Sequence, residues 1–332
     1  MNLVQEAVER GGKLTPLIIP AKLTGGQGLL NPSVFVDHDG EILCIVRSIN
    51  YTLYHAEDNM RFPSHWGPLS YLHPESDPFL RTENYLCRLD KNYNITHYTK
   101  IEMLQLHEPI WEFVGLEDAR LFQWYGQLYM CGVRRDTTPN GVGRMELCPI
   151  FLDKENWTAK EIQRERIEVK NVESYLEKNW MPILDHENTF IKWSNPTEVV
   201  EIRGRDSNQS IAKVISLKEG KQPPIDQRGG SQVIKWGDYW VAITHETVLF
   251  KTYLGQKNGQ YRHRLMIWND SWELIGFSPE SFSFMDGQIE FCAGLAVVQY
   301  GWAISFGFQD NCAFVLEVPH ALIGKMVAEC LR

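Results

Sequence analysis

Five segments of the sequence share one pattern, in which a polar or glycine-rich start leads into a short apolar strand, a turn, a second apolar strand and a polar end. They begin at Asn31, Glu117, Lys178, Arg228 and Cys292. Their spacing varies around roughly 50–60 residues, which is typical of units that each contribute one small antiparallel sheet. We therefore predict an all-β chain, a five-bladed β-propeller in which each hairpin forms the inner part of a blade. A generic antiparallel sandwich is the alternative.

The segments between the hairpins predict the remaining elements. Apolar runs from Asn84, Ser210 and Arg262 predict outer strands. Helical spacing predicts short, outward-facing helices over residues 1–10 and 159–169, and a closing helix from His320. Since the sequence contains no low-complexity segment or linker, we expect residues 1–332 to form a single catalytic domain.

The longest interval between hairpins runs from residue 50 to 114 and reads as an inserted loop region. It contains His55, His65, Trp66, Tyr71 and His73. A long aromatic insertion of this kind is either a functional rim or lid, or an irregular packed insertion. Because no HxH or HExxH spacing occurs, we expect no metal site and no cofactor.

Composition excludes several function classes. The chain has 332 residues, of which 43% are hydrophobic and 23% charged, and its net charge of −9 argues against a general nucleic-acid groove. No apolar run is long enough to span a membrane. The seven cysteines are scattered and form no CxxC pair, which favours a reducing, cytoplasmic setting. A homo-oligomer is possible.

The polar hairpin ends carry the chemistry that we expect. In a propeller the innermost strand ends surround one central channel. Carboxylates there suit proton transfer and hydroxyl recognition, and cations suit a phosphate group. The predicted substrate contacts are Asn31, Arg47, Glu117, Arg120, Asp136, Tyr261, Glu290 and Asp310. The predicted phosphate contacts are Arg47, Lys178, Arg228, His245, Arg262 and His263. This mixture indicates a sugar that reacts with, or is released from, a phosphate.

One of these segments, "GLEDARLF" from Gly115, resembles the Gly-x-Glu-Asp-Pro-Arg signature of the mannoside phosphorylases of glycoside hydrolase family 130. The "NPS" at Asn31, the "VRS" around Arg47, the "KNW" at Lys178 and the region of His245 look like further family positions. The resemblance implies a five-bladed propeller and an inverting single displacement. It implies that Asp118 is the general acid or base, acting through a sugar hydroxyl, and that Arg120 orients Asp118 or binds the sugar.

The same resemblance leaves the donor open. Ala119 replaces the signature proline, and the "RGGSQVI" and "IEFCAGLA" segments depart from the family pattern. Related propellers include β-mannosyltransferases that use a sugar nucleotide. We therefore expect a sugar phosphate or nucleotide-sugar donor, and a glycan or other hydroxyl compound as acceptor.

Structural alternatives stand beside these roles. Asp118 suits a turn cap, Glu117 a pair with Arg134 or Arg120, and His245 a buried structural position. Lys178 suits packing over Trp180, and both Trp124 and Trp236 read as packing residues. Two rival functions also remain. A glycoside hydrolase needs a second carboxylate, for which the candidates are Asp136, Glu246, Glu290 and Asp310. A non-catalytic glycan-binding platform needs none.

Overall fold

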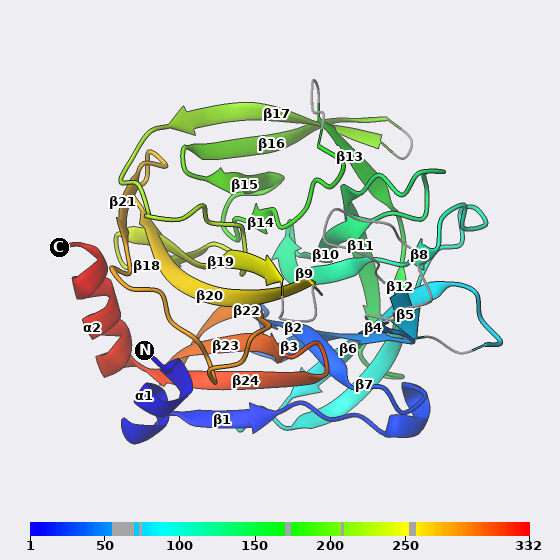
Figure 1. The fold of residues 1–332 in the computed structure, drawn as a ribbon, viewed down its shortest axis with the longest axis horizontal. Coiled ribbons are helices and arrows are strands. Elements are labelled where there is room, and N and C mark those ends of the chain that lie inside the picture. Colours follow the sequence, from blue (N-terminus) through cyan, green and yellow to red (C-terminus); the bar gives the residue numbers. More distant parts are fainter. Residues whose placement is uncertain (55–69, 73–74, 170–173, 207–208, 252–256) are drawn as a thin grey trace.

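The structure is a computed structural model that describes residues 1–54, 70–72, 75–169, 174–206, 209–251 and 257–332 (Figure 1). In this part of the chain it consists mostly of strands, which confirms the predicted all-β class. Short helices lie near both ends, as expected: α1 (Leu3–Glu9) and α2 (His320–Cys330), with a 3-10 turn η1 (Ala21–Leu23) between α1 and the first hairpin. None of the helices described is long and apolar enough to cross a membrane.

Antiparallel strands form five successive runs in the described chain, and each run contains one predicted hairpin. The first run consists of β2 (Leu29–Val36), β3 (Ile42–Ile49), β6 (Leu80–Leu89) and β7 (Ile95–Glu102). The second consists of β9 (Glu117–Trp124), β10 (Gln127–Arg134), β11 (Arg144–Asp153) and, both paired to β11, β12 (Thr158–Glu161) and β13 (Glu165–Val169). The third consists of β14 (Met181–Pro182), β15 (Thr189–Ser194), β16 (Thr197–Asp206) and β17 (Gln209–Lys218).

The fourth run consists of β18 (Ile234–Trp236), β19 (Tyr239–Lys251), β20 (Lys257–Trp268) and β21 (Leu274–Phe277). The fifth joins the two ends of the sequence. Its strands are β22 (Glu290–Val298), β23 (Gly301–Phe308), β24 (Cys312–Pro319) and β1 (Lys13–Pro16). Because β1 pairs antiparallel with β24, the first strand of the chain completes its last sheet (Figure 1).

Parallel contacts between outer strands connect neighbouring runs. The pairs β7–β12 and β13–β17 link the first three runs into one sheet of 14 strands. Within the interval from residue 50 to 114, β4 (Thr52–Tyr54) pairs with β5 (Ser70–Leu72), and β8 (Phe113–Val114) pairs with β6. The expected rim or lid residues His55, His65, Trp66 and His73 lie outside the described residues.

The predicted helix over 159–169 is wrong, because this stretch forms β12 and β13. Burial alternates along β12, where Ala159 and Glu161 are buried while Thr158 and Lys160 are exposed. A period of two is that of a strand. The backbone pairing with β11 therefore outweighs a weak helical spacing of charged residues.

Gln232, which precedes β18 in the fourth run, connects this run to three others. Its fully buried side chain donates from Nε2 to the carbonyls of Val34 in β2 (3.1 Å) and Leu121 in β9 (2.6 Å). Its Oε1 accepts a hydrogen bond from the backbone N–H of Leu295 in β22 (2.9 Å). The leading strands of the first, second and fifth runs therefore converge on one amide group.

Tryptophans of the hairpins pack in the interior, as expected. The indole of Trp124 is 1% exposed and donates to the carbonyl of Ile183 (3.0 Å), which joins the second and third runs. Trp236 packs edge-on against Trp302, with ring centroids 5.3 Å apart, which joins the fourth and fifth runs.

Candidate active site

Irregular backbone at the starts of β2 and β9 aims two polar side chains at each other. The register of β2 against β3 shifts between Leu30 and Ser33, and that of β9 against β10 shifts beside Asp118. Asn31 and Asp118 lie in these bulges with φ angles of 45° and 52°. Bulges redirect side chains, and left-handed backbone at residues other than glycine concentrates at functional sites.

The Asp118 carboxylate is held by two donors. Its Oδ1 accepts hydrogen bonds from Asn31 Nδ2 and from Arg47 Nη1, both at 2.7 Å. Glu117 lies on the same guanidinium, with its Oε2 3.7 Å from Arg47 Nη2. Asn31 packs directly against Gly307. A Cβ atom at position 307 would lie 2.3 Å from Asn31 Oδ1, so a glycine is needed there. The predicted pairs of Glu117 with Arg134 or Arg120 are absent among the ion pairs of the described chain.

These charges set the protonation state of Asp118. Burial alone would raise its pKa, but the positive charges, chiefly those of Arg47 and Lys178, lower the pKa to about 2. Asp118 is therefore a carboxylate at neutral pH, able to accept a proton. The predicted packing of Lys178 over Trp180 is not seen, since Lys192 takes that place, with its ammonium 5.9 Å from the ring centroid.

Two residues that the sequence did not single out hold Arg47 in place. The hydroxyl oxygens of Tyr51 and Thr82 both accept from Arg47 Nη2 at 3.0 Å. Thr82 belongs to β6, the strand next to β3 in the first run, and nothing in its local sequence marks it. Only the pairing of β3 with β6 brings it to Arg47.

The side chain of Arg120 binds the backbone at Asp118. Its guanidinium is buried and donates to the backbone carbonyls of Asp118 (2.7 Å) and Gly230 (2.9 Å), and to Asn179 Oδ1 (3.3 Å). It also lies over the ring of Phe291, at 5.3 Å from the centroid. These bonds fix the backbone at Asp118, so the positioning role expected for Arg120 is supported by its contacts.

His245 and Tyr261 form an aromatic wall on the fourth run. Their rings are stacked with centroids 5.6 Å apart, and His245 meets Phe291 edge-on at 5.1 Å. Burial, followed by the charges of His263, Arg228 and Lys178, lowers the pKa of His245 well below its usual range. Its Nδ1 is buried without a partner in the described structure. Arg228, whose backbone pairs with that of His245, keeps an exposed side chain.

A second carboxylate, Asp310, shares the electrostatic environment of Asp118. It follows β23 with a φ of 51°. Part of its surface is exposed, yet enough protein surrounds the carboxyl group that loss of hydration raises its pKa. The negative charge of Asp118 adds to this shift, while Arg47 and Lys178 oppose it. The two carboxyl groups thus have pKa values displaced in opposite directions.

Four predicted or candidate residues on β20, β22 and β19 are engaged elsewhere. Glu290 is fully buried and accepts from the backbone N–H groups of Phe284, Met285 and Gly287 at 2.6–2.8 Å, so it fixes a loop. His263 is buried between Phe282 and Phe284. Arg262 follows Tyr261 in β20, so its side chain points to the opposite face of the sheet. Its guanidinium donates to backbone carbonyls. Glu246 pairs with Arg264 at 3.0 Å. None of these contacts involves the Asp118 cluster, which consists of Asn31, Arg47 and Asp118.

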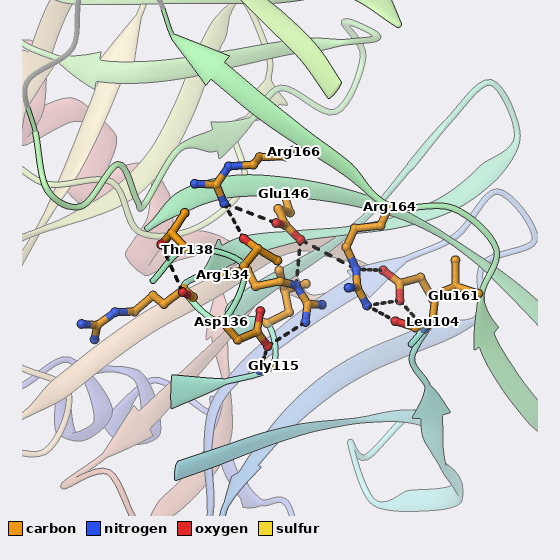
Figure 2. Close-up of polar contacts among 12 residues, drawn as sticks. Leu104, Gly115, Arg134, Asp136, Thr138, Glu146, Glu161, Arg164 and Arg166 are labelled. Atoms are coloured by element: carbon orange, nitrogen blue, oxygen red, sulfur yellow. Dashed lines mark hydrogen bonds and ion pairs between the residues drawn. The ribbon is translucent and has the colours of Figure 1, made fainter. Parts of the chain in front are cut away.

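Asp136 is also displaced from this cluster. Its carboxylate accepts from the backbone N–H of Gly115 (2.9 Å) and lies 3.4 Å from Arg134 Nη1. Arg134 in turn pairs with Glu146 at 2.7 Å, in a network of buried charges beside β11 (Figure 2). No group of three or more His, Cys, Asp or Glu residues in the described ranges is arranged to hold a metal ion.

Comparison with known proteins places this geometry in context. No protein-family model matches the sequence, and neither does any curated protein. Solved structures do match. The β-1,2-mannobiose phosphorylase from Listeria innocua, in complex with β-1,2-mannobiose, superimposes with a TM-score of 0.53 and 12% identity over 92% of each chain. MPT-1, a GDP-Man-dependent mannosyltransferase from Leishmania mexicana, gives a TM-score of 0.52 and 11% identity over 97% of this chain and 95% of that one.

A third match comes from a study of family GH130, described as mannoside phosphorylases that include glycoside hydrolases targeting β-1,2-mannosidic linkages in Candida mannan. It gives a TM-score of 0.53 and 11% identity over 88% of this chain and 85% of that one. At such identities the similarity establishes the fold. The chain therefore has a GH130-like fold, shared with phosphorylases, a hydrolase and a mannosyltransferase.

Proposed function

We propose that residues 1–332 form a single five-bladed β-propeller domain that catalyses glycosyl transfer with inversion. The donor carries the sugar on phosphate, as a sugar nucleotide or a sugar 1-phosphate, and the acceptor is a glycan or another hydroxyl compound. The transferred unit is a hexose of mannosyl type. Five antiparallel runs support the propeller, and so does Gln232, which joins the leading strands of the first, second and fifth runs.

The observation that carries the proposed activity is the Asp118 carboxylate, held between Asn31 and Arg47 with further cations around it. In the synthetic direction the acceptor oxygen bonds to the anomeric carbon as the bond from that carbon to the phosphate oxygen breaks. Asp118 takes the proton of the acceptor hydroxyl, directly or through a sugar hydroxyl, and the phosphate leaves with the bonding electrons. With a pKa of about 2, Asp118 is ionised at neutral pH and is therefore in the form that accepts a proton.

The reverse direction, phosphorolysis, needs a protonated Asp118. Inorganic phosphate, the nucleophile in this direction, makes the local charge more negative when it binds, which favours protonation of Asp118. Lys178 helps to hold the pKa of Asp118 down, and it is also one of the cations that we assign to phosphate. A dianion bound there offsets this positive charge, and so raises the pKa of Asp118. Cations on the phosphate also stabilise the charge that develops on the leaving group.

Hydrolysis is the second candidate, and Asp310 is the observation that favours it. Inverting hydrolysis uses one carboxylic acid and one carboxylate. Asp118, with its pKa lowered, and Asp310, with its pKa raised, are the candidates for the carboxylate and the acid. Water would then replace phosphate as the reaction partner, and the product would be a free sugar.

The experiment that tests the proposal is a screen for released phosphate or nucleotide from sugar 1-phosphates and nucleotide sugars, with mixed saccharide acceptors. On the donor that reacts, Asp118→Asn should lower turnover by about 10²- to 10⁴-fold, the usual contribution of general acid–base catalysis. Asp238→Asn, in the exposed turn between β18 and β19, is the control and should leave turnover unchanged.

Three outcomes would contradict the proposal. Near-normal turnover in Asp118→Asn would remove Asp118 from the catalytic role. Release of free sugar from mannosides without added phosphate would select the hydrolase. The lack of any turnover, together with saccharide binding, would indicate a non-catalytic glycan-binding protein.

A further inference from the structure

A cleft of about 830 Å³ lies between the first and second runs of strands, and Asp118 is not among the residues that line it. On one side its walls come from β6 and from the segment 100–109, and Thr82 and Asn84 belong to this side. The other side comes from β10, β11 and β13, with Arg134, Glu146 and Arg166. The proposed function assigns no role to this cleft.

The charged groups in the cleft neutralise one another. Glu146 is fully buried and lies 2.7 Å from Arg134, 3.7 Å from Arg164 and 3.6 Å from Arg166 (Figure 2). Arg164 also pairs with Glu161 at 2.8 Å, and Arg166 also pairs with Glu168 at 3.0 Å. Because each guanidinium already contacts a carboxylate, the cleft offers no spare charge to an anion. Its chemistry favours a neutral ligand.

Two polar atoms in this network are nevertheless unsatisfied. Arg134 Nη2 and Asp136 Oδ1 have no hydrogen-bond partner within the described ranges, although their residues are only 3% and 7% exposed. An unpaired buried polar group costs about 1–3 kcal/mol. The two side chains are themselves paired, so a free donor and a free acceptor belong to one unit. A hydroxyl group, or a pair of adjacent hydroxyls, satisfies a donor and an acceptor together.

The rest of the lining suits a sugar ring. Met103, Leu104 and Val114 present apolar surface, and Thr137 presents a polar group. Ligand pockets typically combine a mostly apolar wall with a few placed polar groups. A pyranose has the matching surface, with C–H faces and hydroxyl edges.

The cleft is also connected to the Asp118 site by direct contacts. Thr82 lines the cleft and accepts from Arg47, which binds Asp118. Gly115, whose N–H donates to Asp136, lies in the same strand entry as Asp118, three positions earlier in the sequence. One layer of residues therefore separates the two places.

We propose that this cleft is a second carbohydrate site, which takes neutral saccharide units of the acceptor through Arg134 and Asp136. The assignment of the saccharide to the acceptor rests on the proposed function. Binding itself does not, and it is measured without a donor.

The test is isothermal titration calorimetry with β-1,2-mannobiose and longer neutral manno-oligosaccharides. Val114→Trp and Thr137→Trp each fill the cleft from a half-buried position, and Ile110→Trp is the matched control on an exposed residue outside the lining. Circular dichroism and thermal unfolding verify that each variant is folded. We expect at least a ten-fold weaker affinity in the two cleft variants, and wild-type affinity in Ile110→Trp.

Other results would overturn this inference. Unchanged affinity in both folded cleft variants, or no saccharide binding at millimolar concentration, would show that the cleft is not a sugar site. Binding of inorganic phosphate that the cleft variants abolish, without saccharide binding, would identify an anion site instead. Failure of the proposed function has a different signature, since binding would persist in a protein that turns over no donor.

Discussion

Replacing Arg47 by methionine is expected to destabilise the protein strongly at neutral pH. Methionine keeps an unbranched chain but removes the charge that lies 2.7 Å from Asp118 Oδ1. The two side chains are only 7% and 15% exposed, so water replaces the lost partner poorly. Removing one partner of a buried ion pair typically costs about 3–5 kcal/mol, and we expect a loss in this range at pH 7.

The pH dependence of this loss identifies its origin. In the folded wild type the pKa of Asp118 is about 2, below its value of about 3.9 in an unfolded chain. A carboxyl group with a depressed pKa contributes stability above the unfolded pKa and loses it as the pH falls through the folded pKa. At about 1.4 kcal/mol per pKa unit, this contribution is roughly 2–3 kcal/mol at pH 7, and about half of that at pH 3. In Arg47→Met the nearest cation no longer opposes the effect of burial on the pKa of Asp118. The contribution of this carboxylate to stability therefore disappears.

The assay is urea unfolding at pH 7 and pH 3 for the wild type, Arg47→Met, Asp118→Asn and the double variant. The difference between wild type and Arg47→Met should shrink by at least about 1 kcal/mol at pH 3. The double-variant cycle should give a coupling energy above about 1 kcal/mol at pH 7. Equal losses at both pH values, with additive single variants, would refute the assignment of Arg47 as the main electrostatic partner of Asp118.

Three further predictions concern Lys178, Glu290 and His263. Lys178→Ala should raise the Michaelis constant for the donor, with a smaller effect on turnover, and an unchanged constant would remove Lys178 from the phosphate site. Glu290→Gln should lower the free energy of unfolding in urea by about 1–3 kcal/mol, because three backbone N–H groups lose a charged acceptor, while turnover per folded molecule stays normal. Burial lowers the pKa of His263 to about 3, so stability should fall as the pH drops below about 6.5, with a slope approaching 1.4 kcal/mol per pH unit. His263→Phe should flatten this part of the profile, and an identical profile in the variant would contradict the argument.

The hairpins were predictable because their signal is local. Alternation with a period of two and a turn residue at a fixed place identify a strand pair such as β9–β10 without knowledge of its neighbours. The convergence of Asn31, Arg47 and Asp118 was predictable for a related reason, since equivalent strand ends of repeated units share one face. The helix over 159–169 failed because its charged residues are satisfied by distant partners, as in the contact between Arg164 and Glu146.

Pairings across the runs were beyond the sequence. Arg134 was expected beside Glu117, which pairs with the neighbouring Val133 in the hairpin register, but Glu146 on β11 binds Arg134 at 2.7 Å instead. Glu290 had the composition of a substrate ligand, and only the path of the loop from Phe284 to Gly287 reveals its structural use. Such choices between equivalent partners are decided by which strands lie side by side, and that information is non-local.

The pairing of β1 with β24 places a constraint on the order of events during synthesis. Residues 13–16 leave the ribosome early, but their partners at 314–317 follow about 300 residues later. At about 5–20 residues per second this interval lasts roughly 15–60 s. The earlier sheets are complete by then, whereas β1 stays unpaired until β24 has been made. A variant with the residue 1–20 segment moved behind residue 332 would make this contact local in sequence, and would shorten the wait to a few seconds.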